Sequence, residues 1–140
     1  MRGVLRKITE LADIGRIQAN PNPEVRNEVT RQRDESDIIT QAWLWPRVGE
    51  YLRENDVVVS ETGTANFGLW ETKFPPGCVS LNQTLWGSIG WSVGACQGAA
   101  LAVKDAGQHR RTILWVGDGS FQLTAQEVST MIRRELDTTM

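Results

Sequence analysis

The sequence predicts an α/β fold in which a partial parallel sheet carries helices on both faces. Three short apolar runs are read as strands, at residues 57–59, 79–81 and 112–116. Helical patterns separate these runs, and a polar loop rich in small residues follows each of them. Because ligands in parallel sheets bind at the carboxyl ends of the strands, we expect the three loops to share one edge.

Three helical segments accompany the strands. Apolar residues recur at helical spacing over residues 43–52, where Pro46 should begin the helix or kink it. A second helix passes through residues 95–103 and ends at Gly107. The apolar period resumes after residue 120, and Thr-Ala-Gln-Glu at residues 124–127 has the form of a capping box.

Glycines at positions 90, 94 and 98 would lie on one face of the second helix. Each glycine costs a helix about 1 kcal/mol, so such a face needs a structural reason. We expect it to pack closely against the sheet or against a partner subunit.

Composition excludes several classes of function. The chain has 140 residues, enough for one domain or part of one, and a net charge of −2, which argues against a nucleic-acid partner. Cys78, Cys96 and His109 are too few for a disulfide framework or a zinc site, and we expect them to be structural. Residues 89–103 are too few and too polar to span a membrane, and the N-terminus lacks the apolar region of a signal peptide. These features indicate a cytoplasmic protein.

Residues 1–39 differ in character from the rest. Residues 1–17 could form a short helix, Asn-Pro-Asn-Pro at residues 20–23 would stop it, and a highly charged stretch follows. We therefore interpret residues 1–39 as an interdomain linker or the end of a preceding domain, and residues 40–140 as the α/β domain.

Gly-Asp-Gly-Ser at residues 117–120 is the most informative motif. It follows a strand and precedes a helix, so its glycines let backbone N–H groups approach an anion. Asp118 is compatible with a diphosphate there only if a divalent cation lies between them. Gln122 in place of a third glycine excludes a Rossmann fingerprint, and the P-loop Lys is absent. The alternative, a β-hairpin at Asp-Gly, would need a second alternating strand, and none follows.

Three motifs in this order carry a resemblance to a known family. Glu-Thr-Gly-Thr at residues 61–64, Leu-Trp-Gly-Ser-Ile-Gly at residues 85–90 and the motif at residues 117–120 resemble the diphosphate-binding domain of thiamine diphosphate enzymes. The greatest similarity is to the fungal-type pyruvate decarboxylases, over about residues 38–133. The resemblance identifies residues 40–140 as an incomplete cofactor-binding domain.

The resemblance implies a site for thiamine diphosphate and Mg²⁺. Asp118 would bind the metal, the carbonyl of Gly87 would contact the aminopyrimidine, and Ile89 would be the apolar wedge that bends the cofactor. The cofactor-binding residues implied in this way are Thr62, Thr64, Gly87, Ser88, Ile89, Asp118, Gly119 and Ser120. The resemblance implies no catalytic residue within this chain.

The chain also departs from the family pattern. The family completes its metal site with an Asn-Asp-Gly segment, and residues 121–140 contain none. A glutamate on a separate N-terminal domain, usually of a partner subunit, is also outside this chain. We expect the similarity to end at Arg133, as it would in a truncated or altered reading frame, and the chain alone to bind cofactor weakly or not at all and to have no turnover.

The implied reaction converts pyruvate into acetaldehyde and CO₂, by a homo-oligomer that is a dimer or tetramer in the family. A decarboxylase for indolepyruvate or another bulky 2-oxo acid is the alternative within this class. A different alternative is a non-catalytic truncated subunit that docks onto full-length partners through its glycine-lined helix.

Overall fold

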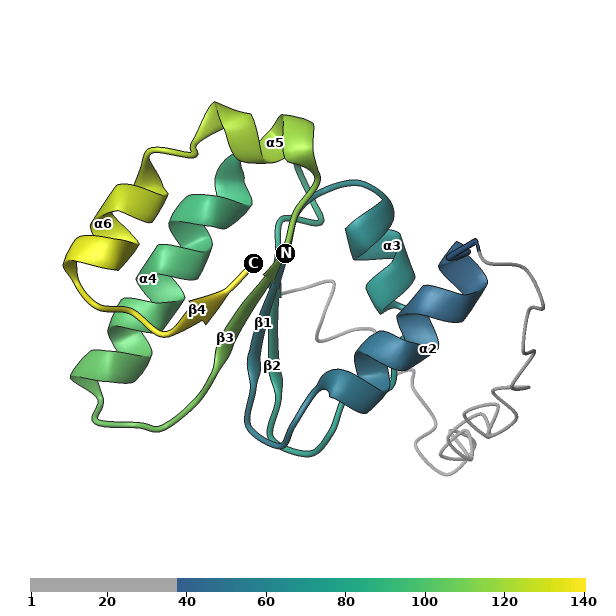
Figure 1. Cartoon of the computed structure of the whole chain (residues 1–140), viewed down its shortest axis with the longest axis horizontal. Coiled ribbons are helices and arrows are strands. Elements are labelled where there is room, and N and C mark those ends of the chain that lie inside the picture. Colours follow the sequence, from purple (N-terminus) through teal and green to yellow (C-terminus); the bar gives the residue numbers. More distant parts are fainter. Residues whose placement is uncertain (1–37) are drawn as a thin grey trace, which may run out of the picture. The chain divides into compact units, whose positions relative to one another are not determined.

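The computed structural model describes residues 38–140 and confirms the α/β class. Its centre is a four-stranded sheet, all parallel, in the order β2-β1-β3-β4. Helices lie on both faces of this sheet (Figure 1). In chain order the elements are α2 (Gln41–Tyr51), β1 (Val57–Ser60), α3 (Thr64–Leu69), β2 (Val79–Asn82), α4 (Trp91–Asp105), β3 (Thr112–Trp115), α5 (Asp118–Leu123), α6 (Glu127–Arg133) and β4 (Thr138–Thr139).

The central strands β1 and β3 supply both hydrophobic cores. Val58 is in register with Ile113, and these two side chains belong to the core that lies against α2 and α3. The next pair, Val59 and Leu114, belongs to the core on the opposite face, against α4 and α6. Successive side chains of a strand point to opposite faces, so a continuous apolar run serves both layers.

The core on the α2–α3 face is organised by Trp45. Its ring is buried and meets Trp115 edge-on, with 5.9 Å between ring centroids. A Cβ built at Gly68 of α3 would lie 1.9 Å from the Trp45 ring. Glycine at position 68 therefore lets α3 lie directly against the indole.

Helix α2 begins earlier than a start at proline would allow. Thr40 caps the helix, since its hydroxyl oxygen accepts a hydrogen bond from the Trp43 N–H at 3.3 Å. Pro46 lies inside the helix. Of the two expectations for Pro46, a helix start is therefore wrong.

The opposite face is covered by α4, which turns its larger side chains inward. Val93 and Cys96 are buried against the sheet together with Met131 of α6. Gly94 and Gly98 point away, and a Cβ built at either would meet no atom within 4 Å. The expected packing of the glycine face against the sheet is therefore wrong, and packing against a partner subunit stays a prediction.

From β3 the chain turns into helices, which excludes the hairpin. The Phe121 N–H donates to the Gly117 carbonyl at 2.9 Å as α5 begins. Helix α6 then starts at Glu127 without a side-chain cap. The expected capping box is wrong, because the Thr124 hydroxyl donates instead to the Gly90 carbonyl at 2.8 Å.

Beyond Arg133 the chain returns to the sheet. Glu135 adopts a left-handed backbone (φ 52°), and the Leu136 N–H donates to the Met131 carbonyl at 3.0 Å. This reversal delivers β4 in parallel register beside β3. The three strands expected from the sequence are therefore joined by a fourth, which the sequence analysis does not predict.

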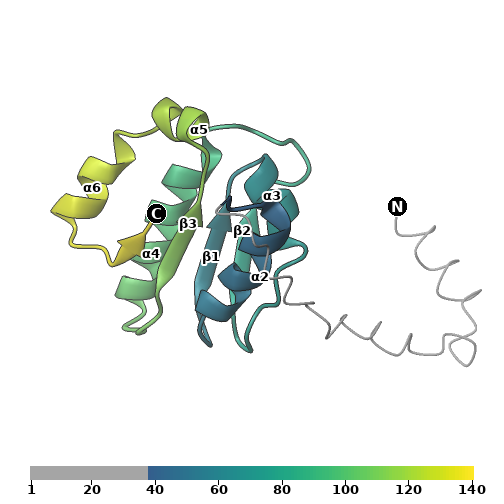
Figure 2. The same cartoon turned by 45° about the vertical axis from the view of Figure 1, so that its right-hand side comes forward.

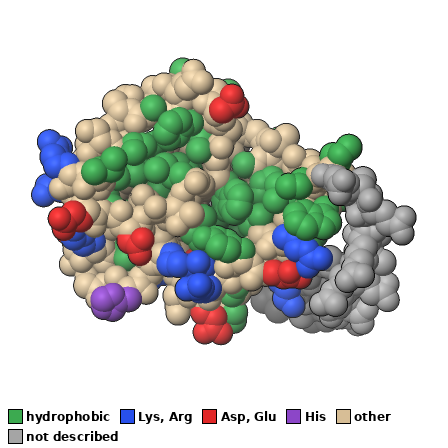
Figure 3. Space-filling model, in the orientation of Figure 1, with side chains coloured by type: hydrophobic (Ala, Val, Ile, Leu, Met, Phe, Trp, Pro, Cys, Tyr) green, Lys and Arg blue, Asp and Glu red, His purple; other side chains and the backbone are tan. Residues whose placement is uncertain are grey.

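Several large hydrophobic side chains of the described part are exposed. Figure 3 shows hydrophobic side chains at the surface of the viewed face on both sides of the sheet.

Within residues 38–140, none of the helices combines the length and the apolar character that crossing a membrane requires. The helix expected at residues 1–17 and the charged stretch up to residue 37 lie outside the described residues.

Candidate functional site

The three predicted loops leave the same edge of the sheet. Because β1, β2 and β3 are parallel, their carboxyl ends lie together, and α3, α4 and α5 all begin at that end (Figures 1 and 2). From β1 the chain first passes to β2 on one side and later to β3 on the other. Such a reversal of strand order opens a crevice at the carboxyl edge, where α/β sheets bind ligands.

The loops after β1 and β2 lie close together. A Cβ built at Gly87 would lie 3.5 Å from Cγ2 of Thr62. Gly87 has a φ of 59°, in the left-handed region that favours glycine. Two residues that are predicted to bind the cofactor and that follow different strands are thus brought close together.

A buried carboxylate joins these loops to α4. Glu61 is 1% exposed, and its Oε2 accepts hydrogen bonds from the Gly90 N–H at 2.9 Å, the Ser92 N–H at 3.2 Å and the Ser92 hydroxyl at 2.8 Å. Its Oε1 accepts a bond from the Thr62 N–H at 3.0 Å. The negative charge lies at the N-terminus of a helix, where the helix dipole stabilises it.

The loop system continues to the end of α5 through Gly90. A Cβ at Gly90, whose φ is 88°, would lie 3.0 Å from Cβ of Leu123. The Thr124 hydroxyl donates to the Gly90 carbonyl from the same segment. Gly90 therefore contacts both the residue that follows β1 and the segment that follows the Gly-Asp-Gly-Ser motif.

The motif itself lies open at this edge. Asp118 and Gly119 are exposed, and Ser120 is half-buried. A Cβ built at Gly117 or Gly119 would meet no atom within 4 Å, which leaves space beside the backbone at the start of α5. The first turn of a helix carries N–H groups without intrahelical partners, and these are donors to an anion.

The other predicted residues are also accessible. Ser88 and Thr64 are exposed, and Ile89 is 58% exposed although it is apolar. Among the described residues no hydrogen bond joins Asp118 to Thr62 or Thr64. The structure therefore places Thr62 close to Gly87 and leaves the remaining predicted residues on the open surface of the same edge.

Asp118 is the carboxylate that the Gly-Asp-Gly-Ser motif places at this edge. Within residues 38–140 no group of three or more His, Cys, Asp or Glu side chains could hold a metal ion. Mg²⁺ commonly binds through one or two carboxylates together with phosphate oxygens and water. The donor set on this edge is therefore compatible with Mg²⁺ only when a diphosphate supplies further oxygens.

Sequence reasoning missed the residues that hold the three loops together. The sequence analysis assigns no role to Glu61, predicts Gly90 to lie on a glycine face of a helix, and predicts Thr124 to cap the last helix. A signal for Glu61 was present, because an acidic residue directly follows a fully buried strand. Nothing local in the sequence indicates the bond from Thr124 to Gly90, which spans 34 positions.

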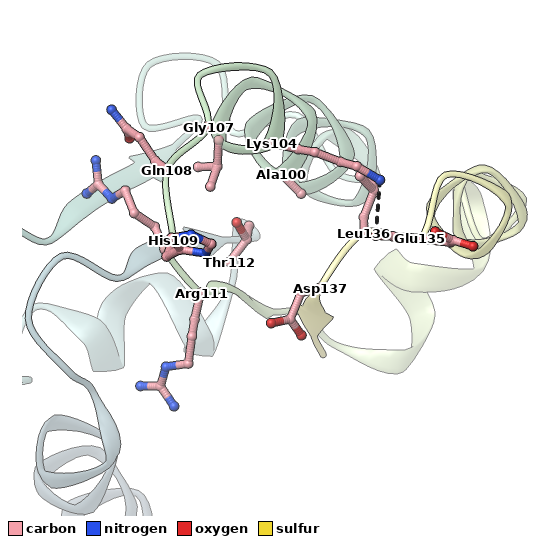
Figure 4. Close-up of a pocket in the computed structure, with 12 residues that line it drawn as sticks. Ala100, Lys104, Gly107, Gln108, His109, Arg111, Thr112, Glu135, Leu136 and Asp137 are labelled. Atoms are coloured by element: carbon pink, nitrogen blue, oxygen red, sulfur yellow. Dashed lines mark hydrogen bonds between the residues drawn. The ribbon is translucent and has the colours of Figure 1, made fainter.

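A cavity of about 550 Å³ lies at the opposite edge, where β3 begins (Figure 4). Its lining includes Lys104, whose Nζ donates to the Arg134 carbonyl at 2.6 Å, and His109. None of the predicted cofactor-binding residues lines it. The cavity is therefore separate from the predicted site.

Arg111 in this cavity wall forms an ion pair with Asp56. Its Nε donates to Asp56 Oδ1 at 3.0 Å, and Asp56 is 2% exposed. Burial raises the pKa of Asp56, but hydrogen bonds from Arg111 and from the Arg53 N–H outweigh burial and lower that pKa below its usual range. The pair fixes the amino end of β1 against that of β3.

The cysteines lie away from the carboxyl edge. Cys96 is fully buried in the α4 core, and burial raises the pKa of its thiol to about 11. Cys78 is half-buried and free, and its Sγ donates to the Arg53 carbonyl at 3.1 Å. Both have the packing roles expected of structural residues.

Comparison with known proteins places this geometry in a family. Residues 61–140 match the family model described as thiamine pyrophosphate enzyme, C-terminal TPP binding domain. A pyruvate decarboxylase of Aspergillus fumigatus is 57% identical over 139 residues, 98% of this chain and 24% of that protein. A pyruvate decarboxylase isozyme of Saccharomyces cerevisiae is 42% identical over 134 residues, 95% of this chain and 24% of that protein. The solved structure of a candidate thiamin diphosphate-dependent enzyme from Mycobacterium smegmatis aligns with a TM-score of 0.59 at 27% identity, covering 71% of this chain and 19% of that one.

These matches correct one expectation and show how much of each relative the chain covers. The family match continues to residue 140, so the expected end of similarity at Arg133 is wrong. The chain spans about a quarter of the length of the curated relatives that it matches. The matched residues include all three loops of the carboxyl edge. The chain belongs to the thiamine pyrophosphate enzyme family, as its C-terminal, cofactor-binding domain.

Proposed function

We propose that this chain carries the diphosphate- and metal-binding part of a thiamine diphosphate-dependent pyruvate decarboxylase. The observation that carries the proposal is that the loops after β1, β2 and β3 meet at one edge of the sheet. All three loops lie within the residues that match the cofactor-binding family. The pyruvate decarboxylase names of the relatives support pyruvate as the substrate. When bound, thiamine diphosphate supplies the electron sink for decarboxylation.

Asp118, Gly119 and Ser120 would hold the diphosphate end. The exposed Asp118 carboxylate supplies one oxygen to Mg²⁺, and the open space beside Gly119 admits phosphate oxygens to the backbone. Thr62, from the loop after β1, and Thr64, the first residue of α3, would contact the cofactor from the other side of the crevice.

Gly87, Ser88 and Ile89 would hold the organic part of the cofactor. Gly87 is fixed beside Thr62, and Ile89 presents an apolar side chain that is 58% exposed. An exposed isoleucine at a predicted ligand edge is compatible with a wedge that becomes covered when the cofactor is bound. In this proposal the chain's residues bind and orient the cofactor, and the remaining groups come from outside the chain.

The division of the chain is also proposed. Residues 40–140 would form an incomplete cofactor-binding domain, and residues 1–39 a linker or the end of a preceding domain. The working assembly would be a homo-oligomer, because in the family the glutamate of the N-terminal domain usually reaches the cofactor site from a partner subunit.

A chimera tests the proposal. The matched residues of the Aspergillus fumigatus pyruvate decarboxylase would be replaced by this chain, to which they are 57% identical. We expect thiamine diphosphate- and Mg²⁺-dependent release of acetaldehyde from pyruvate, because the chimera restores the missing groups around the carboxyl edge. A folded chimera that retains no cofactor and no turnover would contradict the proposal.

The same chimera discriminates the alternatives. A higher kcat/KM for indolepyruvate than for pyruvate would favour a decarboxylase for bulky 2-oxo acids, although most of the substrate-facing surface belongs to the host. The non-catalytic reading is tested with the 140-residue chain itself. Stable co-purification with a full-length decarboxylase, lost when a large residue replaces Gly94 or Gly98 on the open face of α4, would support a docking subunit.

A further inference from the structure

The three loops of the carboxyl edge are joined through a single residue, Gly90. Its N–H donates to Glu61 at 2.9 Å, and its carbonyl accepts from Thr124 at 2.8 Å. It is buried, and Leu123 lies against its Cα. Gly90 thus has hydrogen-bond partners from the segments after both β1 and β3, while it belongs itself to the segment after β2.

Glu61 is fully committed to this junction. Its carboxylate accepts four hydrogen bonds, three from Gly90 and Ser92 and one from Thr62. With 1% of its surface exposed, the carboxylate has no solvent to replace a lost bond. A buried charge held only by hydrogen bonds is costly to disturb, so the junction resists movement.

We infer that Glu61 and Thr124 are positioning residues that set the relative placement of the three cofactor loops through Gly90. Neither belongs to the predicted cofactor-binding residues, and each acts on those residues indirectly, through hydrogen bonds to the backbone of the loops. The Glu61 carboxylate holds Thr62 by accepting a hydrogen bond from the Thr62 N–H. It holds the segment that follows Ile89 by accepting a hydrogen bond from the Gly90 N–H. Thr124 ties the end of α5, the helix that Asp118 opens, to the same point. The inference concerns the geometry of the site and rests on the proposed function for its catalytic consequence.

Isosteric variants remove the bonds while they keep side-chain shape. In Glu61→Gln, the amide nitrogen would face N–H donors on one side of the side chain, so at least one bond becomes a donor–donor contact. Thr124→Val removes the hydroxyl donor to Gly90 with little change in volume. Asp56→Asn is the matched control, because Asp56 is as buried as Glu61 but lies at the amino end of β1.

Amide hydrogen exchange of the 140-residue chain reads the junction without any cofactor. In Glu61→Gln, one of the Thr62, Gly90 and Ser92 N–H groups faces the amide nitrogen and the others lose a charged acceptor. Exchange is expected to become about tenfold or more faster at one or more of these three amides, while the β1 and β3 amides change by about twofold or less. Thr124→Val is expected to speed exchange over residues 87–91 to a smaller extent. Asp56→Asn should speed exchange most around residues 53–57, with no preferential effect at Thr62, Gly90 or Ser92.

The outcomes decide the inference separately from the proposed function. Unchanged exchange at all three of Thr62, Gly90 and Ser92 in Glu61→Gln, or a uniform increase like that of a globally destabilised protein, would overturn it. If Glu61→Gln does not fold, Thr124→Val decides alone, since no change over residues 87–91 in that variant would equally overturn it.

The dependence of the chimera's activity on thiamine diphosphate concentration then measures the effect of each variant on the cofactor site. Both variants are expected to raise the thiamine diphosphate concentration for half-maximal activity about tenfold while the saturated kcat changes by about threefold or less. A loss confined to kcat would overturn the positioning role. An inactive wild-type chimera would instead remove the proposed function and leave the exchange result standing.

Discussion

Thr62 and Gly87 are neighbours across two loops that follow different strands, with a separation that a single added carbon would close to van der Waals contact. The separation between Thr62 Cγ2 and the position of a Cβ at Gly87 is 3.5 Å, and Gly87 has a φ of 59°. The space beside Gly87 would admit a methyl group, but the backbone conformation does not suit one. The requirement for glycine at position 87 is therefore conformational.

Gly87→Ala is expected to destabilise the protein by about 1 kcal/mol, because an L-residue with a side chain is strained in the left-handed region. Urea unfolding followed by circular dichroism measures the change. Gly94→Ala is the matched control, since Gly94 is helical and open, and alanine there should stabilise α4 by up to about 1 kcal/mol. Changes of the same sign in both variants would contradict the assigned conformations.

Gly68→Ala should destabilise the protein although alanine favours helices. The new Cβ would fall 1.9 Å from the Trp45 ring, so α3 or the indole must move, at a cost of about 1–3 kcal/mol. Thermal unfolding and the near-ultraviolet circular dichroism of tryptophan would report the shift. Gly98→Ala, with no atom within 4 Å of its Cβ, should have a neutral or stabilising effect, and a stable Gly68→Ala would contradict the close approach of α3.

The Asp56–Arg111 pair gives stability a pH dependence. The pKa of Asp56 is lowered in the folded state, so its contribution is present above the unfolded value of about 3.9 and is lost as pH falls through the folded value. At neutral pH, Asp56→Asn should cost about 2 kcal/mol, less than a fully buried pair would, because the Arg111 side chain is 24% exposed.

Urea titrations between neutral pH and acid would measure both effects of Asp56→Asn. The variant should lose less stability than the wild type on acidification, because the titrating group is gone. Glu50→Gln serves as control, since Glu50 pairs with Arg47 at the surface and should change stability by about 0.5 kcal/mol or less. An unaltered acid dependence in Asp56→Asn would show that other groups control it.

The two thiols should differ in reactivity. Burial raises the pKa of Cys96 to about 11, so at pH 8 almost no thiolate is present and the sulfur is inaccessible. A disulfide reagent that releases a coloured thiolate should titrate Cys78 in the native protein and Cys96 only after unfolding. Cys78→Ser should abolish the native reaction, and rapid modification of both thiols would contradict the buried position of Cys96.

The elements predicted from sequence share strong local signals. The runs around Val58 and Ile113 were predicted as strands because buried parallel strands are continuously apolar, and the Gly-Asp-Gly-Ser helix followed from its motif. The short strand at Thr138 was not predicted, because two polar residues acquire strand character only by pairing with β3.

The parts of the site that sequence reasoning missed depend on long-range contacts. Thr124 matches a capping box locally, yet its hydroxyl reaches Gly90 because the approach of Leu123 to that glycine brings the two segments together. Likewise, the four-residue glycine spacing was recognised without its direction, which the burial of Val93 and Cys96 determines. Tertiary packing, rather than local propensity, decided each of these cases.

The affinity of the chimera for thiamine diphosphate in the presence of Mg²⁺ tests the central proposal most directly. Asp118→Ala is expected to weaken binding by about 100-fold or more, because it removes the carboxylate that would hold the metal against the diphosphate. Asp137→Ala is the control, since Asp137 is an exposed carboxylate in the cavity at the opposite edge and should leave the affinity unchanged. Equal affinities for the wild-type and Asp118→Ala chimeras would contradict a metal–diphosphate site at the carboxyl edge.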